Sequence, residues 1–119
     1  MAPDLGRRRK AWTRNATLVA NQMRRGCNCA FLTLGDPLLY STYIYLLREL
    51  RAVDPAVKVV TVPGITAFSA AAALANRPVG EGKQWVTIVP ASDDFRRFAE
   101  ALDRGGTVVL MKVGRRLEK

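Results

Sequence analysis

The sequence predicts an α/β protein in which parallel strands alternate with helices. Short apolar runs rich in β-branched residues alternate with segments whose apolar residues recur at helical spacing. Two of these runs stop at glycine turns, Gly35-Asp36-Pro37 and Pro63-Gly64, and a helical pattern follows each turn. An order of this kind is typical of a parallel sheet joined by right-handed crossovers.

The first half of the chain predicts helix, strand, helix and strand in that order. A helix is expected over residues 11–25, with Gly26 as its stop, and a fully apolar strand over 27–34. A second helix is expected over 38–52, and a β-branched strand over 57–62. Parallel neighbouring strands would bring both glycine turns to one edge of the sheet, where open α/β sheets bind their ligands.

The second half continues the alternation. Its patterns predict a helix over 66–75, a linker over 80–83, a strand over 85–89, a helix over 93–102 and a strand over 107–113.

Three regions follow from this order of elements. We expect a basic disordered arm over residues 1–10, an α/β cofactor-binding domain over 11–79, and the start of a second α/β domain over 80–119. The sequence contains no apolar stretch of about 20 residues and no secretory signal pattern, so we expect a soluble cytoplasmic protein without a membrane partner.

The charge distribution restricts the partners. The formal net charge is +9, and +6 of it falls in the first 26 residues. Such a segment attracts polyanions, which include nucleic acids, anionic surfaces and ligands with many carboxylates. Basic residues are not interleaved with aromatic residues across the rest of the chain, which disfavours a nucleic-acid module.

The sequence lacks the residues that several kinds of catalytic and binding site require. The chain has no histidine, and its two cysteines, Cys27 and Cys29, have no further ligands near them for a metal site. We expect both cysteines to be free and buried in the strand over 27–34. The glycine patterns of dinucleotide and nucleoside-triphosphate sites are absent as well.

Four short segments together resemble one family. Residues 32–37, 40–42, 62–67 and 109–112 read LTLGDP, YST, VPGITA and VLMK. This set is similar to the tetrapyrrole methylases, and most similar to the members that methylate precorrin-2 at C20. The resemblance implies an enzyme of cobalamin biosynthesis that transfers a methyl group from S-adenosylmethionine to precorrin-2 or its cobalt form and releases S-adenosylhomocysteine. A non-catalytic fragment of this fold and an RNA methylase of the same superfamily are the alternatives.

The resemblance also implies a set of site residues. The implied cofactor contacts are Leu34, Gly35, Asp36, Leu39, Ser41, Thr42, Thr66, Ala67 and Met111, and Asp36 is also the implied catalytic residue. Its carboxylate would bind a cationic or hydroxyl-bearing part of the cofactor, or would stabilise positive charge that develops on the attacking pyrrole. The implied acceptor carries many carboxylates, for which the candidate partners are Arg48, Arg77, Lys112, Arg115 and Arg116.

The chain also departs from the family's pattern. The family's first strand and its G-x-G-P-G-D-P loop have no counterpart here, and most of the second domain is lacking. We therefore expect a truncated core with weak cofactor affinity and low or absent turnover, unless another chain supplies the lacking parts. Open sheet edges and uncovered apolar faces also predict a homodimer or a larger assembly.

Overall fold

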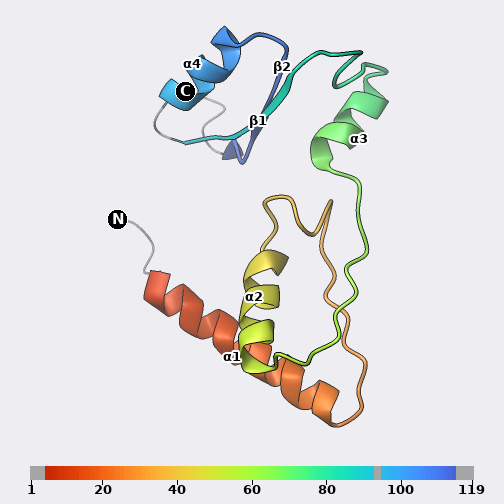
Figure 1. Ribbon diagram of the computed structural model, residues 1–119, viewed down its shortest axis with the longest axis vertical. Helices are drawn as coiled ribbons and strands as arrows, with labels where there is room; N and C mark the ends of the chain where they lie inside the picture. Colours follow the sequence, from red (N-terminus) through yellow and green to blue (C-terminus); the bar gives the residue numbers. More distant parts are fainter. Residues whose placement is uncertain (1–4, 93–94, 115–119) are drawn as a thin grey trace. The chain divides into compact units, whose positions relative to one another are not determined.

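The computed structural model describes residues 5–92 and 95–114, and the chain divides into two compact units, Met1–Thr66 and Ala67–Lys119. The first unit contains helices α1 (Leu5–Arg24) and α2 (Tyr43–Val53). The second contains α3 (Ala67–Leu74), β1 (Val86–Pro90), α4 (Arg96–Asp103) and β2 (Thr107–Met111) (Figure 1). The division falls at Thr66 and not at the linker over 80–83 that the sequence predicts, and none of the residues of α3 is buried.

Helix α1 begins earlier than the sequence predicts. Residues 5–10, expected to be part of a disordered arm, form its first turns. Leucine, arginine and lysine in this stretch are good helix formers, which explains the extension. The predicted stop is confirmed, because Gly26 adopts a φ of +85° and the Cys27 amide donates to the carbonyl of Gln22 at 3.1 Å. The Gly26 amide also donates to the carbonyl of Met23 at 2.9 Å, and the two bonds together form the Schellman motif that ends many helices.

The two helices of the first unit cross and enclose its small core (Figure 1). Ala16 and Ala20 of α1 are fully buried against Leu46 and Leu50 of α2. Partly buried side chains surround this cluster, namely Trp12, Val19, Val53, Val57 and Val59. Alanine at the crossing lets the two helix backbones approach closely, so the core depends on small side chains at these two positions.

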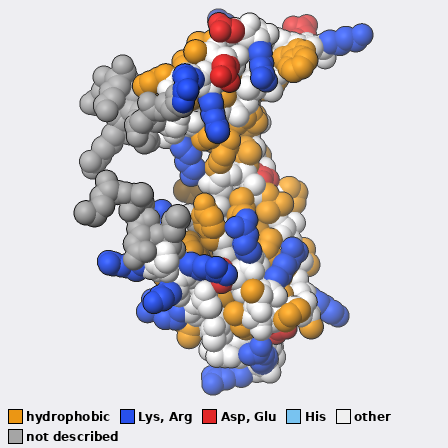
Figure 2. Space-filling view, turned by 60° about the vertical axis from the view of Figure 1, so that its left-hand side comes forward, with side chains coloured by type: hydrophobic (Ala, Val, Ile, Leu, Met, Phe, Trp, Pro, Cys, Tyr) orange, Lys and Arg blue, Asp and Glu red, His pale blue; other side chains and the backbone are white. Residues whose placement is uncertain are grey.

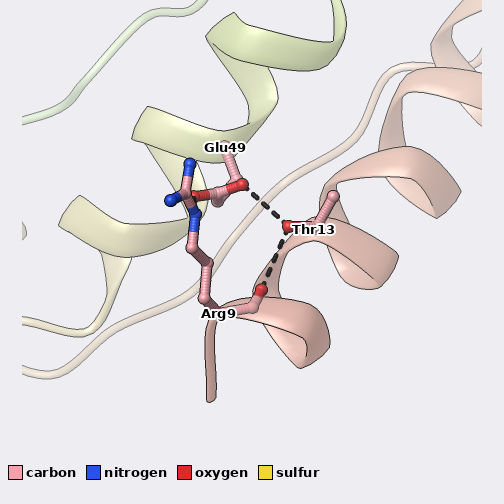
Figure 3. A network of polar contacts seen from close by, with 3 residues as sticks. All are labelled: Arg9, Thr13 and Glu49. Atoms are coloured by element: carbon pink, nitrogen blue, oxygen red, sulfur yellow. Dashed lines mark hydrogen bonds and ion pairs between the residues drawn. The ribbon is translucent and has the colours of Figure 1, made fainter. Parts of the chain in front are cut away.

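A polar contact holds the same two helices at the edge of the core. Figure 3 shows Glu49 of α2 accepting a hydrogen bond from the Thr13 hydroxyl at 2.8 Å. The second Glu49 oxygen lies 3.3 Å from Nε of Arg9. Because Arg9 is largely exposed, this ion pair contributes little, and the partly buried bond from Thr13 matters more.

Enlarging the helix crossing is expected to destabilise the first unit. The substitution Ala16→Leu places extra methyl groups at a position with no exposed surface, so we expect the free energy of unfolding to fall by about 1–3 kcal/mol. Ala11→Leu on the exposed face of α1 is the matched control and should change stability by less than about 0.5 kcal/mol. Chemical denaturation of the two variants checks this, and equal midpoints would contradict the assigned core.

The two strands predicted in the first half of the chain are extended but unpaired. Residues 27–34, the first segment, and residues 57–62, the second segment, belong to no strand of the sheet that the structure describes. Among the described residues, no backbone hydrogen bond joins one segment to the other. As a result Cys27 and Cys29 are exposed, so the predicted burial of these two free cysteines is wrong.

Helix α2 begins later than predicted. The sequence pattern starts it at residue 38, but the structure starts it at Tyr43. Tyr40 adopts a left-handed φ of 51°, which a helix cannot contain, and the Ser41 hydroxyl accepts the Tyr43 amide at 3.2 Å. Residues 38–42 therefore form a loop after the glycine turn.

The second unit confirms the predicted parallel pairing of its strands. β1 and β2 form a two-stranded parallel sheet with Val86 opposite Thr107 and Pro90 opposite Met111. Helix α4 connects them and contacts β1, and its Ala101 is buried, as is Val89 of β1. The described helix begins at Arg96, and residues 93 and 94 of the predicted start lie outside the described part. Of the helices that the structure describes, none combines the length and the apolar character that a membrane crossing needs.

Candidate functional site

The two glycine turns of the first unit lie against each other. Gly35 comes directly after the first segment, Gly64 lies two residues beyond the second, and both segments run toward this contact (Figure 1). The Gly35 backbone has a φ of +73°, and a Cβ atom on Gly64 would overlap the Gly35 carbonyl. Only glycine leaves room for this approach. The two turns therefore meet as predicted, although the segments that lead to them do not pair into the predicted sheet.

Asp36 joins the two turns through its carboxylate. Oδ1 accepts the amide of Leu38 at 2.8 Å, and Oδ2 accepts the amide of Gly64 at 3.1 Å. The backbone hydrogen bonds from Leu38 and Gly64 lower the pKa of this carboxyl group below its usual value, because they favour the charged form. Asp36 is therefore ionised at neutral pH, and it fixes the geometry of the loop between residues 35 and 42.

Hydroxyl groups connect this loop to the segments. The Ser41 hydroxyl lies 3.3 Å from that of Thr33 in the first segment. The Tyr43 hydroxyl lies 2.8 Å from that of Thr61 in the second segment, and the Tyr43 ring packs against Phe31 with centroids 5.7 Å apart. Tyr43, at the start of α2, thus contacts both segments below the turns.

The predicted site residues fall into two groups. Those of the first unit surround the joined turns: Leu34, Gly35, Asp36, Leu39, Ser41, Thr42 and Thr66. Leu34 is 98% exposed, and the side chain of Leu39 is half-buried in the loop. Ala67 and Met111 belong to the second unit, where Ala67 begins α3 and Met111 ends β2.

Three residues that organise this site were not among the predicted contacts. Gly64 contributes the amide and the close approach, and Thr61 and Tyr43 hold the segments to α2. The Pro-Gly pair after a β-branched run was the available signal for Gly64. No sequence pattern pairs Thr61 with Tyr43, because that contact depends on how the helix packs.

A pocket of about 530 Å³ lies between the two segments and the two helices of the first unit. Its walls are mainly apolar and include Phe31 and Thr33 on one side, Val59 and Thr61 on the other, and Leu46 of α2. Of the predicted cofactor contacts only Gly35 lines it. The pocket therefore lies inside the unit and is distinct from the loop surface that carries Asp36 and Leu39.

Basic side chains dominate the outside of the first unit. Helix α1 carries Arg7, Arg8, Arg9, Lys10, Arg14 and Arg24 and no acidic residue. Figure 2 shows blue lysine and arginine side chains spread over the part of the view that holds α1 and α2. Of the candidate partners for acceptor carboxylates, Arg48, Arg77 and Lys112 are exposed, and Arg115 and Arg116 lie outside the described residues. Within the described residues, no three His, Cys, Asp or Glu side chains form a group that would hold a metal ion.

The β-α-β unit of the second unit and the loop that Asp36 fixes in the first unit are typical of an α/β protein, and the candidate site lies at the ends of extended segments. The whole chain, residues 1–119, matches the family model described as Tetrapyrrole (Corrin/Porphyrin) Methylases. The chain belongs to this family.

Curated relatives of known name agree with the family. The chain is 31% identical over 113 residues to a cobalt-precorrin-2 C(20)-methyltransferase of Salmonella typhimurium, covering 95% of this chain and 46% of that protein. It is 32% identical over 119 residues to a probable cobalt-precorrin-2 C(20)-methyltransferase of Methanocaldococcus jannaschii, covering 100% and 48%. It is 34% identical over 105 residues to a precorrin-2 C(20)-methyltransferase of a Sinorhizobium species, covering 88% and 42%. The chain thus spans about half the length of the curated relatives it matches.

Proposed function

We propose that this chain is the cofactor-binding part of an S-adenosylmethionine-dependent methyltransferase that acts at C20 of precorrin-2 or its cobalt form. The observation that carries the proposal is the contact between the two glycine turns, held by the Asp36 carboxylate. The names of the relatives support the substrate class, since they describe C20-methyltransferases of precorrin-2 and cobalt-precorrin-2. The proposed compartment is the cytoplasm, where two exposed free cysteines remain reduced.

The loop surface fits a nucleoside with a charged sulfur. The ionised Asp36 offers lone pairs not used by Leu38 and Gly64, and each of its oxygens can accept a further hydrogen bond. The exposed Leu34 and the half-buried Leu39 supply apolar contact beside it. We assign Leu34, Asp36, Leu39 and Thr66 to hold the cofactor in the first unit.

Methyl transfer from a sulfonium needs alignment more than acid–base chemistry. When bound, the cofactor supplies a methyl group that is already activated for displacement. The chain's own task is then to hold donor and acceptor in line, which contributes up to about 7–11 kcal/mol in favourable cases. The lack of histidine is compatible with this task. The basic surface of the first unit is suited to attract an acceptor with many carboxylates.

Filling the loop should abolish cofactor binding. We expect Leu39→Trp to remove S-adenosylhomocysteine binding in isothermal titration, because the indole occupies the space beside the half-buried leucine. Leu38→Trp, at an exposed neighbouring side chain, is the matched control and should bind as the parent does. Unchanged binding by the Leu39 variant would show that the loop is assigned wrongly. Absence of binding by the parent chain would favour the alternative of a non-catalytic fragment.

A further inference from the structure

Few side chains anchor the parts of the first and second segments that lie nearest the glycine turns. In the first segment, Leu32 and Leu34 are 90% and 98% exposed. In the second segment, Val60 and Val62 are 87% and 74% exposed. Within the part of the chain that the structure describes, no backbone hydrogen bond joins the two segments. Because side chains alternate along an extended backbone, the residues between these exposed ones hold the position of each turn.

Tyr43, at the start of α2, contacts both segments at this place. Its ring packs against Phe31 with centroids 5.7 Å apart, and its hydroxyl lies 2.8 Å from that of Thr61. Its amide donates to the Ser41 hydroxyl at 3.2 Å, which in turn lies 3.3 Å from the hydroxyl of Thr33. The two threonines stand two and three residues before the glycines of the turns. One residue of α2 is therefore connected to each segment shortly before its turn.

The hydroxyl pair of Tyr43 and Thr61 is the anchor of the second segment nearest its turn. Val57 and Val59 pack against the core and hold only the start of that segment. Tyr43 is 8% exposed and Thr61 is half-buried, and a buried hydroxyl without a partner is costly. From Thr61 to Gly64 the chain advances three residues, or roughly 10 Å when extended. A shift of the threonine is therefore passed on to the glycine.

The contact that Gly64 makes tolerates little displacement. Its amide donates to Oδ2 of Asp36 at 3.1 Å, near the long end of the range of about 2.7–3.2 Å for such bonds. A shift of roughly 0.5 Å away from the carboxylate would place the amide outside that range. The two helices are held by a separate cluster of alanine and leucine side chains. Loss of the hydroxyl pair should therefore loosen the joined turns without unfolding the helices.

We propose that Tyr43 is a positioning residue for the loop over residues 35–42. By binding Thr61 of the second segment, it brings the Gly64 amide within reach of the Asp36 carboxylate. The order of the joined turns then determines how tightly the loop holds the cofactor. This consequence for the cofactor rests on the proposed function, whereas the consequence for the contact between the turns does not.

Removing one hydroxyl tests the proposal. We expect Tyr43→Phe to speed hydrogen exchange of the Gly64 amide about threefold or more, as followed by nuclear magnetic resonance without cofactor. The same variant should bind S-adenosylhomocysteine about three- to tenfold more weakly in isothermal titration. Tyr45→Phe removes a phenol hydroxyl from a 52% exposed side chain of the same helix and is the matched control, which should change neither quantity. Equal Gly64 exchange in the two variants would overturn the proposal.

A double-mutant cycle and a conservative variant separate positioning from packing. Thr61→Val keeps the shape of the side chain and should match Tyr43→Phe in both measurements. The double variant should be no worse than either single one, because both substitutions remove the same bond. Thr61→Ser retains the hydroxyl and should stay within about twofold of the parent. Additive effects, or a serine variant as impaired as the valine variant, would contradict the assigned pair.

The two readouts distinguish a failure of this inference from a failure of the proposed function. If the parent chain binds no S-adenosylhomocysteine but Tyr43→Phe still speeds Gly64 exchange, the proposed function is wrong and the positioning role stands. If the parent binds and neither hydroxyl variant changes Gly64 exchange, the positioning role is wrong and the proposed function stands. Faster exchange with unchanged affinity would contradict the consequence for the cofactor.

Discussion

Replacing Gly64 with alanine is expected to force the two glycine turns apart and to abolish S-adenosylhomocysteine binding. The added Cβ would overlap the carbonyl oxygen of Gly35, stand 2.9 Å from its carbonyl carbon and 3.3 Å from Cα of Asp36. All three atoms belong to the backbone, so no side chain can rotate away. We expect a loss of about 1–3 kcal/mol in the free energy of unfolding, together with the loss of the bond from the Gly64 amide to Asp36.

A second glycine provides the control for this variant. Gly26 ends α1 with a φ of +85°, and a Cβ there would meet nothing within 4 Å. Gly26→Ala should therefore cost about 1–2 kcal/mol through backbone strain alone. Its cofactor affinity should match that of the parent, because the substitution lies away from the turns. If Gly64→Ala binds S-adenosylhomocysteine as tightly as Gly26→Ala does, the contact between the turns is not the basis of the site.

The sequence predicts well those parts of the fold that local contacts determine. The β1–α4–β2 unit is confirmed, since adjacent elements can complete that pairing. The end of α1 is confirmed as well, because Gly26 encodes it locally. The meeting of the turns at Gly35 and Gly64 was also predictable, because Asp36 and two glycines mark it.

The errors arise where a residue's structure depends on distant partners. Cys27 and Cys29 have the composition of a buried strand, but burial on both faces needs neighbouring strands that the described chain does not pair with them. The helical structure of residues 5–10 was not predicted, because a run of arginines is typical of a solvated arm. Each arginine is nevertheless a good helix former. The late start of α2 follows from the left-handed Tyr40, which the helical pattern does not reveal.

Replacing Asp36 with asparagine is expected to weaken S-adenosylhomocysteine binding about tenfold at neutral pH. Both carboxylate oxygens accept backbone amides, and an asparagine side chain has one oxygen and an NH₂ group that cannot accept the second amide. Titration calorimetry at pH 7 measures the change. Asp54→Asn, at the end of α2, removes a carboxylate of the same kind away from the turns and should leave the affinity unchanged.

The same carboxylate predicts how stability depends on pH. Hydrogen bonds from Leu38 and Gly64 lower the pKa of Asp36 in the folded chain, so the unfolded chain binds the proton more readily. The stabilisation from Asp36 is therefore fully present above the unfolded pKa of about 3.9 and is lost as the pH falls through the lower, folded value. Denaturation of the parent and of Asp36→Asn should show a constant difference from about pH 7 to pH 5 that shrinks in more acidic solution. If the difference in the free energy of unfolding grows as the pH falls, the carboxylate does not accept the two amides. Another interaction would then have to hold the two turns together.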